Sequence, residues 1–577
     1  MNTKVSMLFQ SKTKVYTILV LIPLCLYFKS LFYDFSPMDD QWLIIRNAAS
    51  LSNWENLPDF FTKPTAELYY RPLLSVSLMI DYHISHLSPY SYHFTNLLLH
   101  ILCVVLLFNF LKQLNVDNKL SFLLSILFAV HPVLLHSVAW IPGRNDSLLT
   151  AFTLVSFITL NQYVLKNNFK FLIIHFLAFV LALLTKENAF LLPIFFLTLC
   201  YNKIKTKQLL SLITLWLVIV IAWFIIKLNV VNIFPSAGHN VILTIKNSVF
   251  GYLIFIGKSV LPFQLSVAPT YLHTSIIPGI IVLLLFTFLY FKFGFKNARF
   301  GWLGIVIFFV MLIIPIWYSA SSISQEHYEH RAYLPLVGII LFISQLRIDV
   351  NAKIFNYLIL IMVIAFSLKT FQRMEVYKNE ETFLDAGIKE APENYFFQFK
   401  NGDVLYKNKR FTEALIAYNK ALEKQPGKIQ ILNNRGNVFV ALGKKREAII
   451  DFNNAIKLSN SSPQAYLNRC LAYNAFGEIE NAMNDLIFLK SNHPDFVPNG
   501  LEEVISNKWN VLMFEELNQK IAQEPQNAIL YVNRAKLFLT KRMGKEALSD
   551  LKKACELEPN NQNFKNYFNE LNSSFPH

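Results

Sequence analysis

The sequence has few charged residues and few cysteines for its length. Only 16% of its 577 residues are Asp, Glu, Lys or Arg, against about 25% in an ordinary soluble domain. This shortage, with a mean hydropathy of +0.37, excludes a single soluble globule and a disordered chain. The five cysteines contain no CxxC pair, which argues against a zinc site or a disulfide framework.

Long apolar runs take the place of charge, since 54% of the residues are hydrophobic and 52 are Phe. Several runs approach the roughly 20 residues that a membrane-spanning helix needs. They cover about 15–33, 92–111, 120–140, 147–165, 171–184, 188–201, 209–230, 274–291, 301–318, 332–346 and 354–368. A further run, 247–263, is interrupted by Gly251, Gly257, Lys258 and Pro262. We therefore predict a polytopic membrane domain that lies in a lipid bilayer.

Loop charges predict its orientation. Lysines precede the first run and recur in the loops at 112–119, 166–170 and 203–207, and short loops rich in Lys and Arg stay on the inner side of a membrane. The cluster at 292–299 falls inside only if 247–263 is re-entrant or lies flat. That choice gives eleven spans and an external C-terminal half. It also explains the net charge of +15 better than a nucleic-acid groove does, so we expect no nucleic-acid partner.

The acidic residues are distributed differently from the basic ones. Of the thirteen Asp and Glu residues before residue 372, all but Asp117 and Asp349 fall in the predicted outer loops. The same distribution would also arise if the inner loops simply favoured Lys and contained few acidic residues, without any functional site outside. Ionisable groups close to span ends, however, usually mark a site or a pathway.

A repeat occupies the C-terminal third. Ala414, Ala448 and Ala482 are 34 residues apart, and Asn434-Arg435 recurs at 468–469 and 533–534. This period is typical of helix–turn–helix tetratricopeptide (TPR) repeats, with a degenerate unit at 495–526. Stacked repeats form an α-solenoid whose concave face binds protein or peptide; a merely structural cap is the alternative. We predict an all-α chain with a membrane domain at 1–368, a helical linker at 369–393 and a TPR domain at 394–577.

The chemistry-bearing residues cluster in the predicted outer loops. Asp39 and Asp40 are adjacent carboxylates, which can serve as a general base and its orienting or metal-binding partner, although most such pairs are solvated loop residues. Arginine pairs with phosphate oxygens bidentately, so nearby guanidinium groups suit a phosphate leaving group. The further site candidates are Arg71, Arg144, Asp146, Lys186, Glu187, Glu329 and Arg331. Lys186 and Glu187 could also be only an ion pair at the membrane edge.

Several of these residues stand in recognisable strings. Tyr-Arg-Pro-Leu at 70–73, Tyr-His-Phe-Thr-Asn-Leu-Leu-Leu-His at 92–100, and His-Pro-Val at 131–133 followed by Val-Ala-Trp-Ile-Pro-Gly-Arg-Asn-Asp at 138–146 resemble the transmembrane-and-TPR-repeat O-mannosyltransferase family and its bacterial relatives. The resemblance covers about 30–190, 319–338 and the repeats. It implies a GT-C-type glycosyltransferase that uses a polyprenyl-phosphate sugar as donor, usually a hexose such as mannose, at an extracytoplasmic or lumenal active site.

The resemblance also implies roles. Asp39 and Asp40 match the family's catalytic acidic pair, and we expect Asp39 to act as the base on an acceptor hydroxyl, with inversion at the sugar, and Asp40 to support it. From charge and placement we assign Arg144, Lys186 and Arg331 to the donor phosphate and Arg71 to ordering the loop. Relatives carry an acid where this chain has His136, which puts that carboxylate's role in doubt here.

A divalent metal is an open expectation. His327 and His330, three residues apart and interleaved with Glu326 and Glu329, offer metal-ligating side chains, but the spacing is loose. We predict no other cofactor.

The leading prediction is a membrane glycosyltransferase that moves a sugar from its lipid carrier to a protein hydroxyl, with the TPR domain recruiting the acceptor or a partner. The alternatives are a lipid-linked oligosaccharide transferase and a non-enzymatic membrane-anchored TPR scaffold. A composition rich in Ile, Lys, Asn and Phe favours a bacterial inner membrane, with the active site and TPR domain on the periplasmic side.

Overall fold

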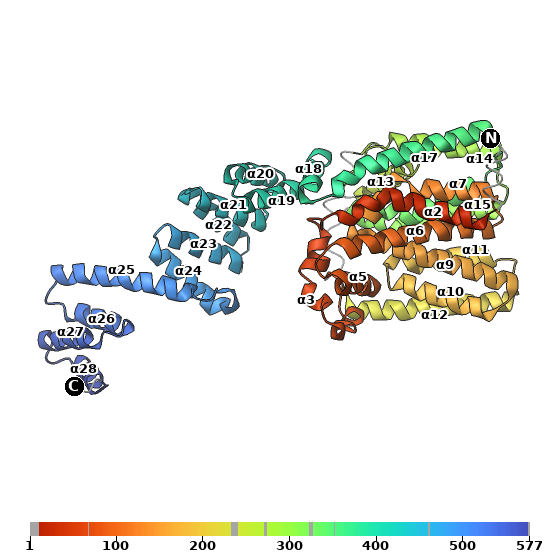
Figure 1. The fold of residues 1–577 in the computed structure, drawn as a ribbon. Helices are drawn as coiled ribbons and strands as arrows, with labels where there is room; N and C mark the ends of the chain where they lie inside the picture. The colour runs from red at the N-terminus through yellow and green to blue at the C-terminus, as the bar shows by residue number, and fades with distance from the viewer. Residues whose placement is uncertain are drawn as a thin grey trace. The chain divides into compact units, whose positions relative to one another are not determined.

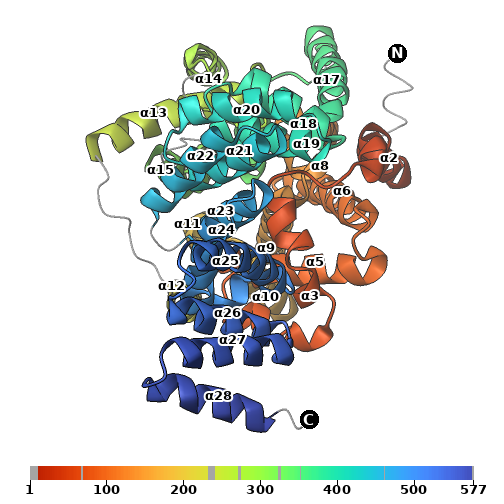
Figure 2. The same cartoon turned by 90° about the vertical axis from the view of Figure 1, so that its left-hand side faces the viewer.

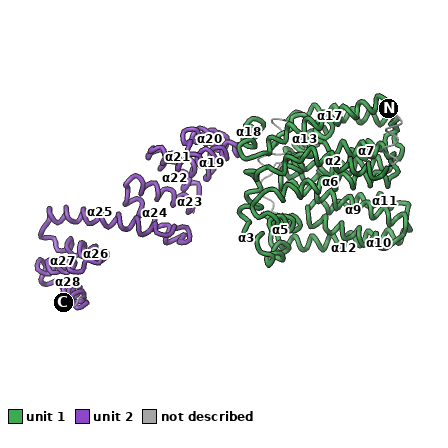
Figure 3. The backbone as a smooth tube through the Cα atoms, viewed as in Figure 1, with its two compact units in different colours: residues 1–394 green, residues 395–577 purple. Residues whose placement is uncertain are grey.

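The fold was analysed in a computed structural model, which describes residues 11–66, 69–231, 241–270, 274–321, 327–350, 352–459 and 462–574. Glu326, one of the possible metal ligands, lies outside these residues. The described residues form helices and isolated bridges but no strand, so the all-α prediction is confirmed. The chain divides into two compact units, residues 1–394 and 395–577 (Figure 3).

Unit 1 is a bundle of apolar helices that lie side by side (Figure 1). Among its described residues, seven helices are long and apolar enough to cross a membrane, or eight with the bent pair that meets at 130–131. Its principal helices are α2 (Lys12–Tyr27), α6 (Tyr90–Gln113), α7 (Asn118–Ala129), α8 (Leu135–Ala139), α9 (Arg144–Lys166), α10 (Phe169–Leu183), α11 (Leu192–Cys200), α12 (Thr206–Val230), α13 (Val241–Lys258), α14 (Ile277–Phe293), α15 (Ala298–Ser321), α16 (Tyr333–Gln345) and α17 (Lys353–Met374). By these bounds α2, α7, α8, α10, α11, α14 and α16 are each shorter than 18 residues, and the number of spans stays a prediction.

One end of the bundle, here called the loop face, carries the long first loop. This loop holds the short helices η2 (Gln41–Ile45), α3 (Ala48–Leu51), η3 (Trp54–Asn56), α4 (Asp59–Thr62) and α5 (Pro72–Ser85). Backbone hydrogen bonds join it to other segments at the same end: Leu73 N–H donates to Leu184 O, and Asp34 N–H donates to Lys378 O. The first loop, the α10–α11 turn and the segment after α17 therefore share one face.

The opposite end, the turn face, gathers the basic turns. The Lys119 ammonium donates to Val350 O, and Lys296 N–H donates to Gln345 O. These turns are among those that the loop charges assigned to the inner side. Which face meets which side of a membrane stays a prediction.

Helix α13 corresponds to the interrupted run. Its C-terminal Lys258 pairs with Glu329 beside the start of α16, and the following helix, α14, leads to the turn face, where Phe295 is bridged to Leu346. In Figure 2, α13 is seen along its length while α14 is seen nearly end-on. Because α13 is long and apolar enough to cross a membrane, the re-entrant or flat course of this run stays a prediction.

The predicted single run 120–140 is broken by a bend of 48° between α7 and the segment Pro132–Ala139. Pro132 lacks an N–H and cannot continue a helical hydrogen-bond ladder. The bend carries the chain into the buried turn 140–143, which starts α9 at Arg144. A kink at one proline thus places the start of α9 at the loop face.

The predicted linker folds with unit 1. After α17 come η8 (Glu375–Tyr377) and α18 (Glu380–Glu390). Arg373 of α17 forms an ion pair with Glu390, and Glu390 also accepts a hydrogen bond from Val267 N–H. The chain therefore leaves unit 1 from the loop face.

Unit 2 is a row of helix pairs. They are α19 (Tyr395–Lys407), α20 (Phe411–Lys424), α21 (Ile429–Ala441), α22 (Lys445–Leu458), α23 (Pro463–Ala475), α24 (Ile479–Asn492), α25 (Leu501–Gln523), α26 (Ala528–Thr540), α27 (Gly544–Leu557) and α28 (Gln562–Ser574). The repeated alanines Ala414, Ala448 and Ala482 are fully buried, because small residues let paired helices approach closely. Most of the degenerate unit is the single long helix α25.

Candidate active site

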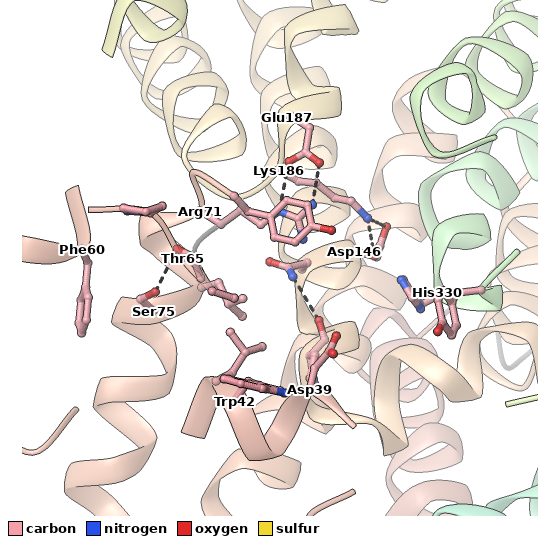
Figure 4. A pocket seen from close by; sticks show the side chains of 18 of the residues that line it. Asp39, Trp42, Phe60, Thr65, Arg71, Ser75, Asp146, Lys186, Glu187 and His330 are labelled. Atoms are coloured by element: carbon pink, nitrogen blue, oxygen red, sulfur yellow. Dashed lines mark hydrogen bonds and ion pairs between the residues drawn. The ribbon is translucent and has the colours of Figure 1, made fainter. Parts of the chain in front are cut away.

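A cavity of about 850 Å³ opens within unit 1 at the loop face. Its walls come from the first loop, from the turns at 140–146 and 186–188, from the end of α15 and from residues 328–331. Six of the nine predicted site residues line it: Asp39, Arg71, Asp146, Lys186, Glu187 and Arg331. Asp40, Arg144 and Glu329 are buried away from it. In Figure 4, Asp39 and Trp42 lie across the cavity from Lys186, Asp146 and Glu187.

The two adjacent carboxylates have different environments. Asp39 is exposed and lines the cavity, whereas Asp40 is 1% exposed. One oxygen of Asp40 accepts a 2.8 Å hydrogen bond from Ser36 N–H. Burial raises the pKa of Asp40 to about 7, and the neighbouring charge of Asp39 adds to the rise. Of the pair, only Asp39 lines the cavity, while Asp40 is buried against the backbone of its own loop.

Lys186 and Asp146 form an ion pair on the cavity wall. The ammonium lies 2.8 Å from both carboxylate oxygens, and both side chains are at most 7% exposed. Asp146 stands in the first turn of α9, where the positive end of the helix dipole favours a negative charge. Lys186 precedes the short helix η6 (Glu187–Leu191), so the α10–α11 turn presents the cation.

Arg71 and Glu187 form a second ion pair, from the first loop to the same turn. Two guanidinium nitrogens of Arg71 donate to the two oxygens of Glu187 at 2.6 and 3.1 Å. The guanidinium also lies 4.1 Å from the ring centroid of Tyr69. A planar bidentate pair fixes orientation as well as distance, while the loop-ordering role of Arg71 stays a prediction.

Arg331 reaches the cavity from the short helix η7 (Glu329–Ala332). Its guanidinium donates to the hydroxyl of Ser319 and to Pro315 O near the end of α15. It also lies 5.3 Å from the ring centroid of Tyr328. Arg331 and Lys186 therefore bring two cations to the cavity from different elements.

The prediction that Arg144 contacts a donor phosphate is wrong, because its side chain is enclosed by the protein. It is 0% exposed and pairs with Asp81 at 2.6 Å. Its guanidinium also donates to Asn96 Oδ1, Ser77 Oγ and Tyr92 O. With its donors used inside the protein, Arg144 ties α9 to α5 and α6 and so positions Asp146 two residues away.

Glu329 corrects a second prediction. It is 2% exposed, and one of its oxygens accepts from both Lys258 Nζ and Ser266 N–H, at 2.8 and 2.9 Å. Its carboxylate therefore anchors the segment between α13 and α14. The neighbouring residues Tyr328 and His330 point to the cavity instead.

The histidine loop does not gather a metal site among the residues described. His327 packs against Phe255 of α13 with ring centroids 6.0 Å apart, while His330 packs against His136 at 4.9 Å. No group of three His, Cys, Asp or Glu side chains with metal-binding geometry occurs in the described part of the chain. The imidazoles of His327 and His330 therefore pack against different residues.

Four neutral residues on the wall were not predicted as site residues: Trp140, Tyr328, Asn145 and Asn188. Trp140 and Tyr328 form an aromatic cluster with His330, which was expected only as a possible metal ligand. Asn145 and Asn188 are sequence neighbours of predicted charged residues. Their position beside predicted site residues was the only sequence signal for them, because an uncharged amide by itself does not indicate a functional role.

Comparison with known proteins confirms the family resemblance. Residues 69–250 match the model described as dolichyl-phosphate-mannose-protein mannosyltransferase. Residues 402–443 match a TPR repeat model, and residues 429–462 match a second tetratricopeptide repeat model. The first match includes every predicted cavity residue from Arg71 to Glu187, and the others fall in unit 2.

The chain is similar to protein O-mannosyl-transferases from animals. It is 23% identical to TMTC3 of Homo sapiens over 87% of this chain and 59% of that protein. It is 24% identical to F38B6.6 of Caenorhabditis elegans, over 62% and 54%, and 35% identical to human TMTC2 over 23% and 17%. The chain thus spans little more than half the length of the first two. Among solved structures, the TPR protein YrrB matches 32% of this chain and 96% of its own, with 18% identity and a TM-score of 0.22.

Proposed function

We propose that this protein, which resembles the O-mannosyltransferases with transmembrane helices and TPR repeats, is a membrane glycosyltransferase. It moves a hexose such as mannose from a polyprenyl-phosphate carrier to a hydroxyl group of a protein. The observation that carries the proposal is the cavity at the loop face, where the exposed carboxylate of Asp39 lies opposite the cations Lys186 and Arg71, and which Arg331 also lines.

Asp39 is the proposed general base. Its carboxylate takes the proton from the acceptor hydroxyl as that oxygen attacks the anomeric carbon of the donor. The bond between the anomeric carbon and the phosphate oxygen breaks in the same step, so the sugar is transferred with inversion. Asp40, buried and held by Ser36 N–H, fixes the loop that presents Asp39.

The cations stabilise the leaving lipid phosphate. Lys186 and Arg331 approach from separate elements and can contact phosphate oxygens as negative charge develops on them. Arg71 lines the same wall while its bidentate pair with Glu187 holds the loop. Because Asp146 and Glu187 offset part of this positive charge, the carrier phosphate can leave after transfer.

The side of the membrane and the place of the TPR domain are proposed from the two faces of unit 1. The chain leaves unit 1 from the loop face, so we place the TPR domain on the active-site side, where it recruits the protein acceptor or a partner. Basic turns gather at the opposite face, which we place toward the cytoplasm by the positive-inside rule. The loop face is then extracytoplasmic, and we keep the bacterial inner membrane as the proposed location.

The test compares wild type with Asp39→Asn. Purified protein receives radiolabelled polyprenyl-phosphate mannose, and then the glucose derivative, with membrane extract as the acceptor source. We expect label in protein with wild type and at least a 100-fold lower rate with Asp39→Asn. Glu55→Gln is the matched control, because Glu55 is an exposed acid of the same loop that does not line the cavity. Equal labelling by wild type and Asp39→Asn would contradict the proposed base.

A further inference from the structure

Two asparagines flank the buried ion pair on the cavity wall. Asn145 precedes Asp146 at the start of α9, and Asn188 follows Lys186 by two residues in η6. Both line the cavity, and they are only 6% and 4% exposed. Neither has a part in the proton or phosphate chemistry proposed above.

The orientation of each amide follows from its partner. Asn145 Nδ2 donates to Pro142 O at 3.3 Å, and Asn188 Nδ2 donates to Met311 O at 2.9 Å. A backbone carbonyl can only accept, so the NH₂ group of each amide must face it. The opposite atom is then an oxygen. Within the described residues, neither Asn145 Oδ1 nor Asn188 Oδ1 has a hydrogen-bond partner.

Buried acceptors without a partner are uncommon in native proteins and call for an explanation. Here both belong to residues that line one cavity and stand within two positions of a member of the same ion pair. An anion would be repelled by amide oxygens, so a phosphate belongs at the neighbouring cations. The acceptors suit a ligand that brings neutral O–H donors into the cavity beside that phosphate.

Aromatic rings complete this part of the wall. The rings of Trp140 and Tyr328 are nearly parallel, with an interplanar angle of 22° and centroids 6.4 Å apart. Tyr328 and His330 stack at 24° and 5.6 Å. Trp140 is held by a hydrogen bond from its indole N–H to Ser36 Oγ. A hexose ring has hydroxyl donors at its edge and C–H groups on its face, so it matches amide acceptors beside a rigid aromatic surface.

We propose that Asn145 and Asn188 form the sugar-recognition subsite, accepting hydrogen bonds from hexose hydroxyls while the ring lies against Trp140, Tyr328 and His330. This inference rests on the proposed function, because it takes the donor phosphate to sit at Lys186 and Arg331. It assigns sugar selectivity to residues distinct from the base and from the phosphate cations.

The test measures binding separately from transfer. Full-length protein in detergent is titrated calorimetrically with mannose 1-phosphate, glucose 1-phosphate and inorganic phosphate. For Asn145→Ala and Asn188→Ala we expect the Kd of the preferred hexose phosphate to rise at least tenfold. The Kd of inorganic phosphate should stay within twofold, which also shows that the variant is folded. Asn47→Ala is the matched control, because Asn47 lines another part of the same cavity.

The outcomes separate this inference from the proposed function. Equal hexose-phosphate affinity in wild type and both variants, or no hexose-phosphate binding by wild type, overturns the subsite. Binding that depends on Asn145 and Asn188, without any sugar transfer by wild type, supports the subsite and contradicts the transferase. Should a variant lose phosphate binding as well, Asn145→Ser and Asn188→Ser repeat the test. Serine keeps a hydroxyl but shortens the side chain, so the hexose-specific loss must persist.

Discussion

Lys186 Nζ lies 2.8 Å from both carboxylate oxygens of Asp146, and neither side chain is more than 7% exposed. The two residues are 40 positions apart, at the starts of η6 and α9. Their pairing brings together two turns of the loop face that both line the cavity. It therefore serves the fold and the proposed site at once.

Breaking this pair on one side is expected to destabilise the protein more than removing both partners. Lys186→Met or Asp146→Leu leaves one uncompensated buried charge, at about 3–5 kcal/mol, whereas the double variant leaves none. Thermal unfolding in detergent for all four proteins gives the coupling energy. A double variant as unstable as the sum of the single variants would mean that the pair has no net coupling.

Asp40 is expected to make stability depend on pH. Its folded pKa of about 7 lies above the ordinary 3.8, so between about pH 4 and 7 the native state retains a proton that the unfolded state has lost. Wild-type stability relative to Asp40→Asn should therefore fall as pH rises, by up to about 1.4 kcal/mol per pH unit, and level off above pH 7. Denaturation of both proteins from pH 4 to 8 measures this difference. A constant difference over the range would show that Asp40 titrates normally.

Substitution by lysine should have different effects at the buried Arg144 and at the cavity-lining Arg331. Arg144→Lys removes the planar fork that serves Asp81, Asn96, Ser77 and Tyr92, so we expect a loss of roughly 3–5 kcal/mol or failure to fold. Arg331→Lys keeps a cation at the cavity. It should fold and raise the KM for the lipid donor several-fold. Size-exclusion profiles and donor kinetics distinguish the two, and a well-folded Arg144→Lys protein would refute the structural role.

Helices α15 and α16 meet at two glycines. A Cβ atom added to Gly304 would lie 2.5 Å from Gly338 O and 2.6 Å from Phe342 N, and backbone atoms cannot yield easily. Gly304→Ala should therefore destabilise unit 1 by about 1–3 kcal/mol and shift His330 and Arg331, which stand in η7 directly before α16. Gly427→Ala is the control, with no atom within 4 Å of the added Cβ. Equal melting temperatures for the two variants would show that the helices separate freely.

Unit 2 repeats one arginine contact from pair to pair. Arg469 donates to both oxygens of Asp485 within its own pair and to Asn453 of the preceding pair. Arg435 and Arg534 repeat the pattern with spacings of 16 residues. Arg469→Leu leaves the buried Asp485 without its cation and should cost about 1–3 kcal/mol. Hydrogen exchange should show α23 and α24 losing protection.

The exposed pair of Arg410 and Glu413 provides the comparison for this variant. Both side chains are 54% exposed, and such surface pairs contribute about 0–1 kcal/mol. Arg410→Leu should therefore leave hydrogen exchange almost unchanged. If it loosened the repeats as much as Arg469→Leu does, the repeated contact would have no special part in their stacking.

Much of the architecture follows from local rules. Spans require long apolar runs, and TPR pairs require small residues at a 34-residue period, so composition and spacing predicted both units. Arg71, Asp146, Lys186 and Glu187 could be placed at one face because alternating spans bring alternate loops together. Charge alone did not reveal that Arg144 and Glu329 are turned inward.

The sequence by itself determined an all-α chain with an apolar bundle, a repeat domain and one face rich in paired charges, because periodicity and hydropathy act over short stretches of chain. Only the tertiary structure decided which charges face the cavity. Whether a carboxylate faces the cavity or is buried in an ion pair depends on the groups that neighbouring helices bring to it. Asp39 and Asp40 are adjacent in sequence, yet burial separates them into an exposed group and an enclosed one. The neutral acceptors Asn145 and Asn188 became visible only when folding set them beside the same cavity.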